Sequence, residues 1–101
     1  MLSYSFTVQA EEDFLHISNY SAKENPAVAT RFINAVETSC EMIVEHPEIE
    51  RTVDFIHQQS IRRLRIKGFQ KYVLFYRLSE QTIEVVRMCH GSRDLPALFQ
   101  V

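Results

Sequence analysis

Basic side chains in the second half of the chain have the types and spacing to hold a phosphate or a carboxylate. Arg63, Arg65 and Lys67 occupy alternate positions, and in an extended strand alternate side chains lie on one face about 7 Å apart. Such a row can bind successive phosphates of a nucleic acid or acidic side chains of a partner protein, and Arg77 or Arg87 can extend it from neighbouring strands. The alternative is a solvated face whose charges protect the sheet from aggregation.

A second group of candidates follows the apolar run that begins at residue 82, in the segment VVRMCHGSRDL. His90 can serve as a general acid or base because an unperturbed imidazole titrates near neutral pH. A single histidine without a positioned partner equally fits a structural role. Arg93 and Asp94 can form a local ion pair that fixes the turn after His90, and such a pair contributes little when it is exposed.

Other chemistries find no support in the sequence. It contains only two glycines and none of the glycine-rich, zinc-protease or nucleophile-elbow motifs of common enzymes. Cys40 and Cys89 lie far apart, without a CxxC partner or clustered histidines, which predicts two reduced cysteines in or near the core. We therefore expect no cofactor, no metal site and no disulfide.

The chain of 101 residues fits one domain, residues 1–101, and 46% of its residues are hydrophobic. No apolar run is long enough to span a membrane and residues 1–10 lack the pattern of a signal peptide, so we expect a cytoplasmic protein without a membrane partner. The net charge of −2 hides an asymmetry, because residues 1–57 carry ten acidic and three basic side chains, whereas residues 58–101 carry three acidic and eight basic ones. The basic half can attract an acidic partner or a nucleic acid, although dedicated nucleic-acid-binding domains are usually basic overall.

Apolar periodicity predicts two antiparallel helices after a first strand. Apolar and polar residues alternate over residues 2–8, as in a half-buried strand, and the acidic residues 11–13 then favour the start of a helix over residues 10–22. Asn25 and Pro26 are typical of a helix N-cap and first helical position. The second helix should end at His46, because Pro47 disfavours helical geometry in the residue before it. Its apolar stripe consists of Ala29, Phe32, Ile33, Val36, Cys40, Ile43 and Val44.

The remainder of the chain predicts a loop and three strands. Residues 47–60 show no clear period and are expected to connect the helices to the sheet. Residues 61–67 place Leu64 and Ile66 on one face and the basic row on the other, whereas residues 72–78 and 82–89 are apolar on both faces, as in central strands. The predicted order is β-α-α-β-β-β, an α+β fold in which a helical hairpin packs on a small, mainly antiparallel sheet.

The same segments resemble the toxins of the RelE/ParE superfamily from bacterial type II toxin–antitoxin modules, and the ParE-like branch fits best. The resemblance covers nearly the whole chain, and its most specific part is VLFYR followed by HGSRD. It agrees with the order of elements predicted from periodicity. It implies a RelE/ParE-like toxin fold and a cytoplasmic protein that forms a hetero-oligomer with a cognate antitoxin, which masks its active face.

Ribosome-dependent members of this superfamily cleave mRNA. By resemblance to them, Arg65, Lys67 and Arg87 would hold the phosphate and His90 would be the acid–base residue. The sequence departs from these members after Gly91, where they tend to place a tyrosine or histidine and this chain has an Arg-Asp pair. Arginine stays protonated at physiological pH and is a poor proton shuttle, although it can stabilise a developing phosphorane.

ParE-like members instead inhibit DNA gyrase by binding, which requires no catalytic group. The resemblance to them implies a target-binding surface made of Arg63, Arg65, Lys67, Arg93 and Asp94. The sequence therefore predicts a ParE-like toxin that targets gyrase. A ribosome-dependent mRNA endoribonuclease and a non-toxic interaction module are the alternatives.

Overall fold

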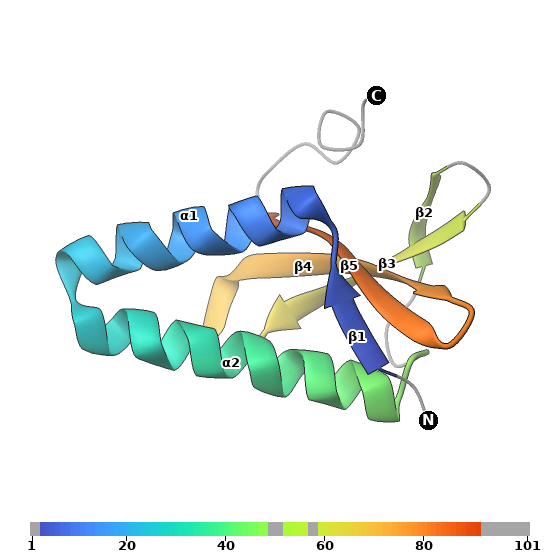
Figure 1. Ribbon diagram of the computed structural model, residues 1–101, viewed down its shortest axis with the longest axis horizontal. Coiled ribbons are helices and arrows are strands. Elements are labelled where there is room, and N and C mark those ends of the chain that lie inside the picture. The colour runs from blue at the N-terminus through green and yellow to red at the C-terminus, as the bar shows by residue number, and fades with distance from the viewer. Residues whose placement is uncertain (1–2, 49–51, 57–58, 92–101) are drawn as a thin grey trace.

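The computed structural model describes residues 3–48, 52–56 and 59–91, which form two helices and a five-stranded sheet (Figure 1). In chain order the elements are β1 (Ser3–Phe6), α1 (Val8–Glu24), α2 (Pro26–Glu45), β2 (Thr52–Ile56), β3 (Gln59–Ile66), β4 (Phe69–Ser79) and β5 (Thr82–His90). The strands lie side by side in the order β1-β5-β4-β3-β2. β1 runs parallel to β5, and the other neighbours are antiparallel. The predicted α+β fold, a helical hairpin on a mainly antiparallel sheet, is confirmed.

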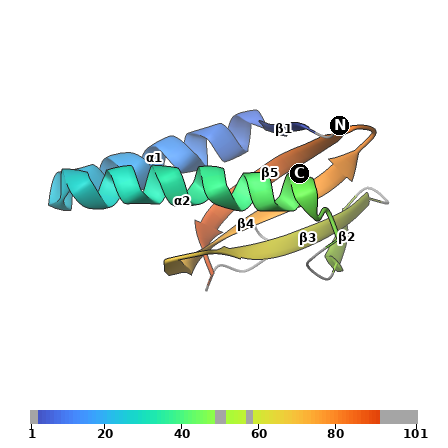
Figure 2. The same ribbon diagram turned by 90° about the horizontal axis from the view of Figure 1, so that it is seen from below.

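The helices and the sheet form two layers, with α1 and α2 covering one face of the sheet (Figure 2). The main core lies between the layers and includes Phe32 and Ile43 from α2 and Leu74, Tyr76 and Ile83 from the central strands. A second apolar cluster lies on the sheet face opposite the helices and consists of Ile61, Val73, Phe75, Val86 and Cys89. Because alternate residues of a strand point to opposite faces, the two clusters explain why β4 and β5 are apolar on both faces.

β1 ends at Phe6, two residues earlier than predicted, because Thr7 is the N-cap of α1. The Thr7 hydroxyl accepts a hydrogen bond from the Ala10 N–H (3.1 Å) and donates one to the Val86 carbonyl (3.0 Å). Val8, which continues the apolar alternation in the sequence, is instead the first residue of α1 and is 71% exposed. A single threonine thus caps α1 and continues the contact with β5 where the strand stops.

The junction of the two helices agrees with the prediction. The Asn25 side chain accepts a hydrogen bond from the Ala27 N–H (3.0 Å), and Pro26 is the first residue of α2. The helix ends at Glu45 with His46 as its C-cap. Most of the predicted stripe is buried, but Ile33 is 40% exposed and lies outside it.

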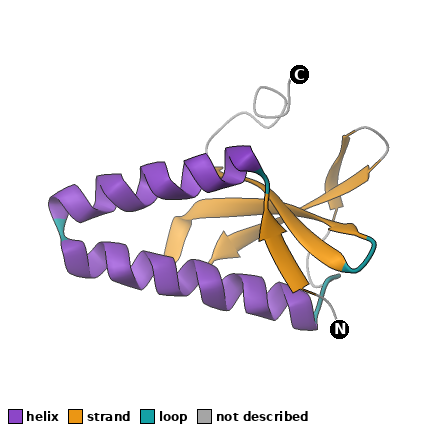
Figure 3. Ribbon diagram, viewed as in Figure 1, coloured by secondary structure: helices purple, strands orange, loops and turns teal. Residues whose placement is uncertain are grey.

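The predicted loop before the sheet is wrong in part, because residues 52–56 form the edge strand β2. The strand pairs with β3, Phe55 opposite Ser60 and Ile56 opposite Gln59, and its register shifts between Thr52 and Asp54. Such an irregularity adds a residue to one strand and interrupts the two-residue alternation by which a strand is recognised in a sequence. The fold therefore contains five strands where four were predicted (Figure 3).

The β3–β4 hairpin is tighter than predicted. The expected gap at residues 68–71 is replaced by a turn at Lys67 and Gly68, and Ile66 faces Phe69 across it. Gly68 has a φ of +85°, in the left-handed region that favours glycine. Lys67 consequently lies in the turn and not in β3.

Candidate functional site

Two of the predicted target-binding residues lie on the sheet face opposite the helices. Arg65 is paired with Val73 on β4, and Arg63 with Phe75. Val73 and Phe75 belong to the second apolar cluster. Leu64 and its partner on β4, Leu74, belong to the main core. Since paired residues point to the same face, the arginines face away from the helices, as the sequence predicted.

The two arginines differ in how freely they can reach a partner. Arg65 is exposed, and its Nη1 donates a hydrogen bond to the Gln70 carbonyl across the hairpin (3.0 Å). Arg63 is half-buried, and its Nη2 would lie 3.3 Å from a Cβ atom placed on Gly91. Arg65 is therefore the more accessible of the pair, and Arg63 packs against the end of β5.

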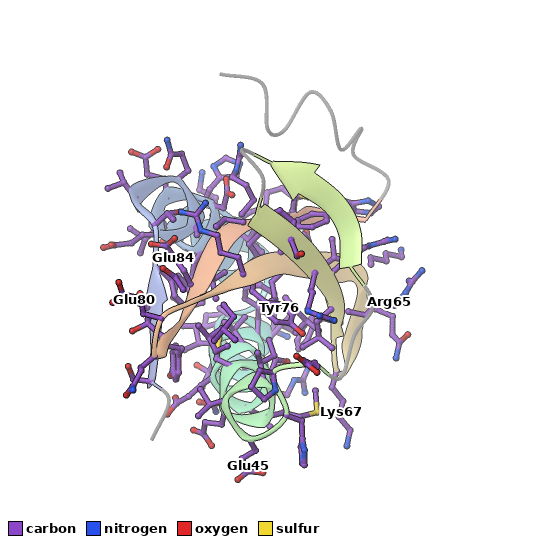
Figure 4. The ribbon with its side chains drawn as sticks, turned by 90° about the vertical axis from the view of Figure 1, so that its right-hand side faces the viewer. Glu45, Arg65, Lys67, Tyr76, Glu80 and Glu84 are labelled. Carbon is purple, nitrogen blue, oxygen red and sulfur yellow. The ribbon has the colours of Figure 1, made fainter. Side chains whose placement is uncertain are left out.

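Lys67 belongs to a different part of the surface. It is exposed in the β3–β4 turn and lines a pocket against α2, together with Arg31 and Phe69. Figure 4 shows Lys67 and Arg65 at the same hairpin. The predicted continuous row of three basic side chains on one strand is thus two arginines on the sheet face followed by a lysine in the turn.

Arg87 is held by an acidic residue of α1. Its Nε and Nη2 donate to the two carboxylate oxygens of Asp13, at 2.7 and 3.2 Å, and the backbone N–H of Met88 donates to the same carboxylate at 3.0 Å. The hydrogen bond to Asp13 is the main cause that raises the pKa of the Arg87 guanidinium above its ordinary value, and burial opposes it. Because its charge is already matched by Asp13, Arg87 is less available to a phosphate than the sequence alone indicated.

His90 ends β5, and its ring meets the ring of Tyr72 edge to face, with 5.8 Å between the centroids. His90 and Arg87 line a cavity of about 290 Å³ between α1 and the end of β5. His16 and Tyr20 of α1 line it as well. This cavity therefore joins two of the residues that resemblance to the ribonucleases implies, but neither Arg65 nor Lys67 belongs to its lining.

The four residues implied for a ribonuclease are distributed over three places. Arg65 lies on the sheet face opposite the helices, Lys67 in the α2 pocket, and Arg87 and His90 in the α1–β5 cavity. In-register residues on β3 and β5 are separated by two strand spacings, about 10 Å. Among these four residues, Arg87 and His90 share one cavity, whereas Arg65 and Lys67 lie outside it.

Three residues that line or organise these places were missed in the sequence: Asp13, His16 and Arg31. The acidic run at 11–13 indicates only a helix start, and helical spacing alone does not tell which strand a helix faces. The remaining predicted pair, Arg93 and Asp94, lies outside the described residues.

Both cysteines are buried and free, as predicted. Burial is the largest cause that raises the pKa of the Cys40 thiol to about 12, and the nearby Glu41 and Glu37 add to it. Cys40 is therefore a protonated core residue at neutral pH and not a nucleophile. No group of three or more potential metal ligands occurs among the described residues, and none of their helices is long and apolar enough to cross a membrane.

Comparison with known proteins gives the family. The profile described as "ParE toxin of type II toxin-antitoxin system, parDE" matches residues 4–95. The chain therefore belongs to this family of ParE toxins. The fold is similar to that of a solved chain described as "Chromosomal ParDE TA system from P. aeruginosa", with a TM-score of 0.73 over 89% of this chain and 96% of that chain. The two are 14% identical, which shows a common fold. No curated protein matches the sequence.

Proposed function

We propose that this chain is a toxin that binds DNA gyrase and inhibits it, and that a cognate antitoxin neutralises the toxin in a hetero-oligomeric complex in the cytoplasm. The observation that carries the proposal is the match to the ParE toxin family over residues 4–95. The solved relative of similar fold is described as a ParDE toxin–antitoxin system, which supports an antitoxin partner for this chain.

The arrangement of the candidate residues favours binding over catalysis. A ribonuclease needs its phosphate-holding cations and its acid–base group within hydrogen-bond reach of one phosphodiester. Lys67 and His90 line separate hollows, and Arg87 already pairs with Asp13. A protein that inhibits by binding requires only an accessible surface.

The surface proposed for gyrase is centred on Arg65. It is exposed, lies on the face that the helices leave uncovered and adjoins Lys67 through the hairpin (Figure 4). Arg63 supports the same face from its half-buried position, and Arg93 and Asp94 are proposed to complete the surface. Guanidinium groups on such a face suit carboxylates of a protein target, because an arginine can donate two parallel hydrogen bonds.

The proposal is tested with purified protein and purified gyrase in a plasmid supercoiling assay. The wild-type chain is expected to inhibit supercoiling, and Arg65→Gln to need a severalfold higher concentration for the same inhibition. Lys23→Gln is the matched control, because it also removes one exposed positive charge but lies at the end of α1. Normal supercoiling at saturating wild-type protein would refute gyrase as the target.

The ribonuclease alternative is tested in the same experiment series. The chain is expressed alone in a bacterial host, and growth is recorded with primer-extension maps of abundant mRNAs. Growth arrest with intact transcripts supports the proposal. Cuts within translated codons that disappear in His90→Ala would assign the protein to the ribonuclease branch. Rescue of growth by the product of a neighbouring small reading frame would identify the antitoxin.

A further inference from the structure

A pocket between α2 and the β3–β4 hairpin is lined by two positively charged side chains. It has a volume of about 310 Å³ and is lined by Arg31, Asn34, Ala35, Thr38, Lys67 and Phe69. The first four occupy positions i, i+3, i+4 and i+7 of α2, so they share one face of the helix. The last two come from the hairpin, which lies far away in the sequence.

The two cations at this pocket have no acidic partner within the part of the chain that the structure describes. Arg31 and Lys67 are both exposed, and neither forms an ion pair with another described residue. None of the acidic residues of α2, at positions 37, 41 and 45, belongs to the described lining of the pocket. Two cations and no acid therefore surround one hollow, which favours an anionic group.

The floor of the pocket is apolar and firmly held. Phe69 is half-buried, packs against the main core and meets the Phe32 ring edge to face at 5.3 Å. Ala35 is half-buried beside it. Asn34 and Thr38 add polar groups at the rim, so the pocket combines an apolar base with a positively charged edge.

This combination selects the occupant. A volume of about 310 Å³ is at the small end of ligand pockets. A nucleic acid would require a basic track that continues beyond the pocket, but α2 continues with acidic residues at positions 37, 41 and 45. A free phosphate would gain nothing from the ring of Phe69. A short peptide segment can place one carboxylate near the cations at the edge of the pocket and an adjacent apolar side chain against the Phe69 ring at its floor.

We propose that the pocket formed by Arg31, Lys67 and Phe69 binds a peptide segment of a partner protein, with a carboxylate between the two cations and an apolar side chain on the phenylalanine ring. The inference goes beyond the proposed function, because it concerns a site on α2 and does not require gyrase as a target. It also gives Lys67 a role separate from that of Arg65.

The test is a titration of the ¹⁵N-labelled full chain with the capped peptide acetyl-Leu-Glu-Leu-Glu-amide, followed by NMR. We expect amide shifts concentrated at residues 31–38 and 67–69, with millimolar affinity that falls as salt is added. Arg31→Gln and Lys67→Gln should each weaken binding about two- to fivefold, as expected for one exposed charge pair. Lys23→Gln should leave the affinity unchanged.

Two further probes decide the chemistry. The peptide acetyl-Leu-Gln-Leu-Gln-amide should bind more weakly, and inorganic phosphate should not reproduce the shifts. Equal binding of the glutamine peptide, equal shifts with phosphate, or no localised shifts up to about 10 mM peptide would each overturn the proposal. Because the readout contains no gyrase, a negative result here leaves the supercoiling assay to judge the proposed function separately.

Discussion

Removal of the Asp13 carboxylate is expected to loosen the attachment of α1 to the sheet. This carboxylate accepts two hydrogen bonds from Arg87 and one from the Met88 backbone N–H, across more than 70 positions of sequence. Met88 is 1% exposed, and the side chains of Arg87 and Asp13 are 24% and 19% exposed. Asp13→Ala therefore leaves a backbone donor and a half-buried guanidinium without their shared acceptor.

The magnitude follows from these two losses. A buried backbone N–H without a partner costs about 1–3 kcal/mol, and a partly exposed ion pair contributes about 0.2–1 kcal/mol. We expect Asp13→Ala to lower the free energy of unfolding by about 2–3 kcal/mol. Asp13→Asn keeps an oxygen acceptor for Met88 and should cost roughly half as much.

The assay is urea denaturation, in which the midpoint should fall by about 1 M or more if the slope is unchanged. Glu84→Ala is the matched control. It removes the ion pair with Arg77, in which the side chains of Arg77 and Glu84 are 27% and 29% exposed. No backbone N–H within the described residues donates to that carboxylate. The control should cost less than about 1 kcal/mol. Equal losses in Asp13→Ala and Glu84→Ala would refute the argument that the Met88 hydrogen bond dominates.

Three other changes test the remaining contacts. Thr7→Ala removes the N-cap of α1 and the hydrogen bond to Val86, and it should lower the free energy of unfolding by about 1–2 kcal/mol in urea denaturation, whereas Thr7→Ser should retain most of it; an alanine variant as stable as wild type would contradict the capping role. Gly91→Ala places a Cβ 3.3 Å from Arg63 Nη2 and 3.5 Å from the Lys71 carbonyl. Because the arginine can move, we expect a melting temperature lower by only a few degrees, and a larger fall for Gly91→Val; no difference between the two variants would argue against close packing there. The pKa of Cys40 is about 12 in the folded protein against an ordinary value of 9.0, so the folded state holds the proton longer and stability should fall as pH rises above about 9, by at most about 1.4 kcal/mol per pH unit. Cys40→Ala should remove this part of the pH dependence in chemical denaturation, and parallel curves for the two proteins would show that the thiol does not titrate in this way.

The accuracy of sequence reasoning varied with the range of the interactions concerned. Asn25 and Pro26 located the helix junction because a cap is formed by neighbours in the chain. Residues 52–56 do not show the pattern of a strand in the sequence, because the register shift of β2 interrupts the alternation that identifies one. The assignment of Lys67 failed by one residue, since strand periodicity does not show where a tight turn begins.

The sequence by itself determined the α+β class, the helical hairpin, the two apolar central strands and the resemblance to ParE-like toxins, because periodicity, capping and motifs are properties of neighbouring residues. Only the tertiary structure decided that β1 pairs in parallel with β5, that Asp13 holds Arg87, and that Lys67 lines a pocket together with Arg31. These features depend on which elements pack together. Burial of the common core decides which elements pack together, and a local pattern of residues does not show this.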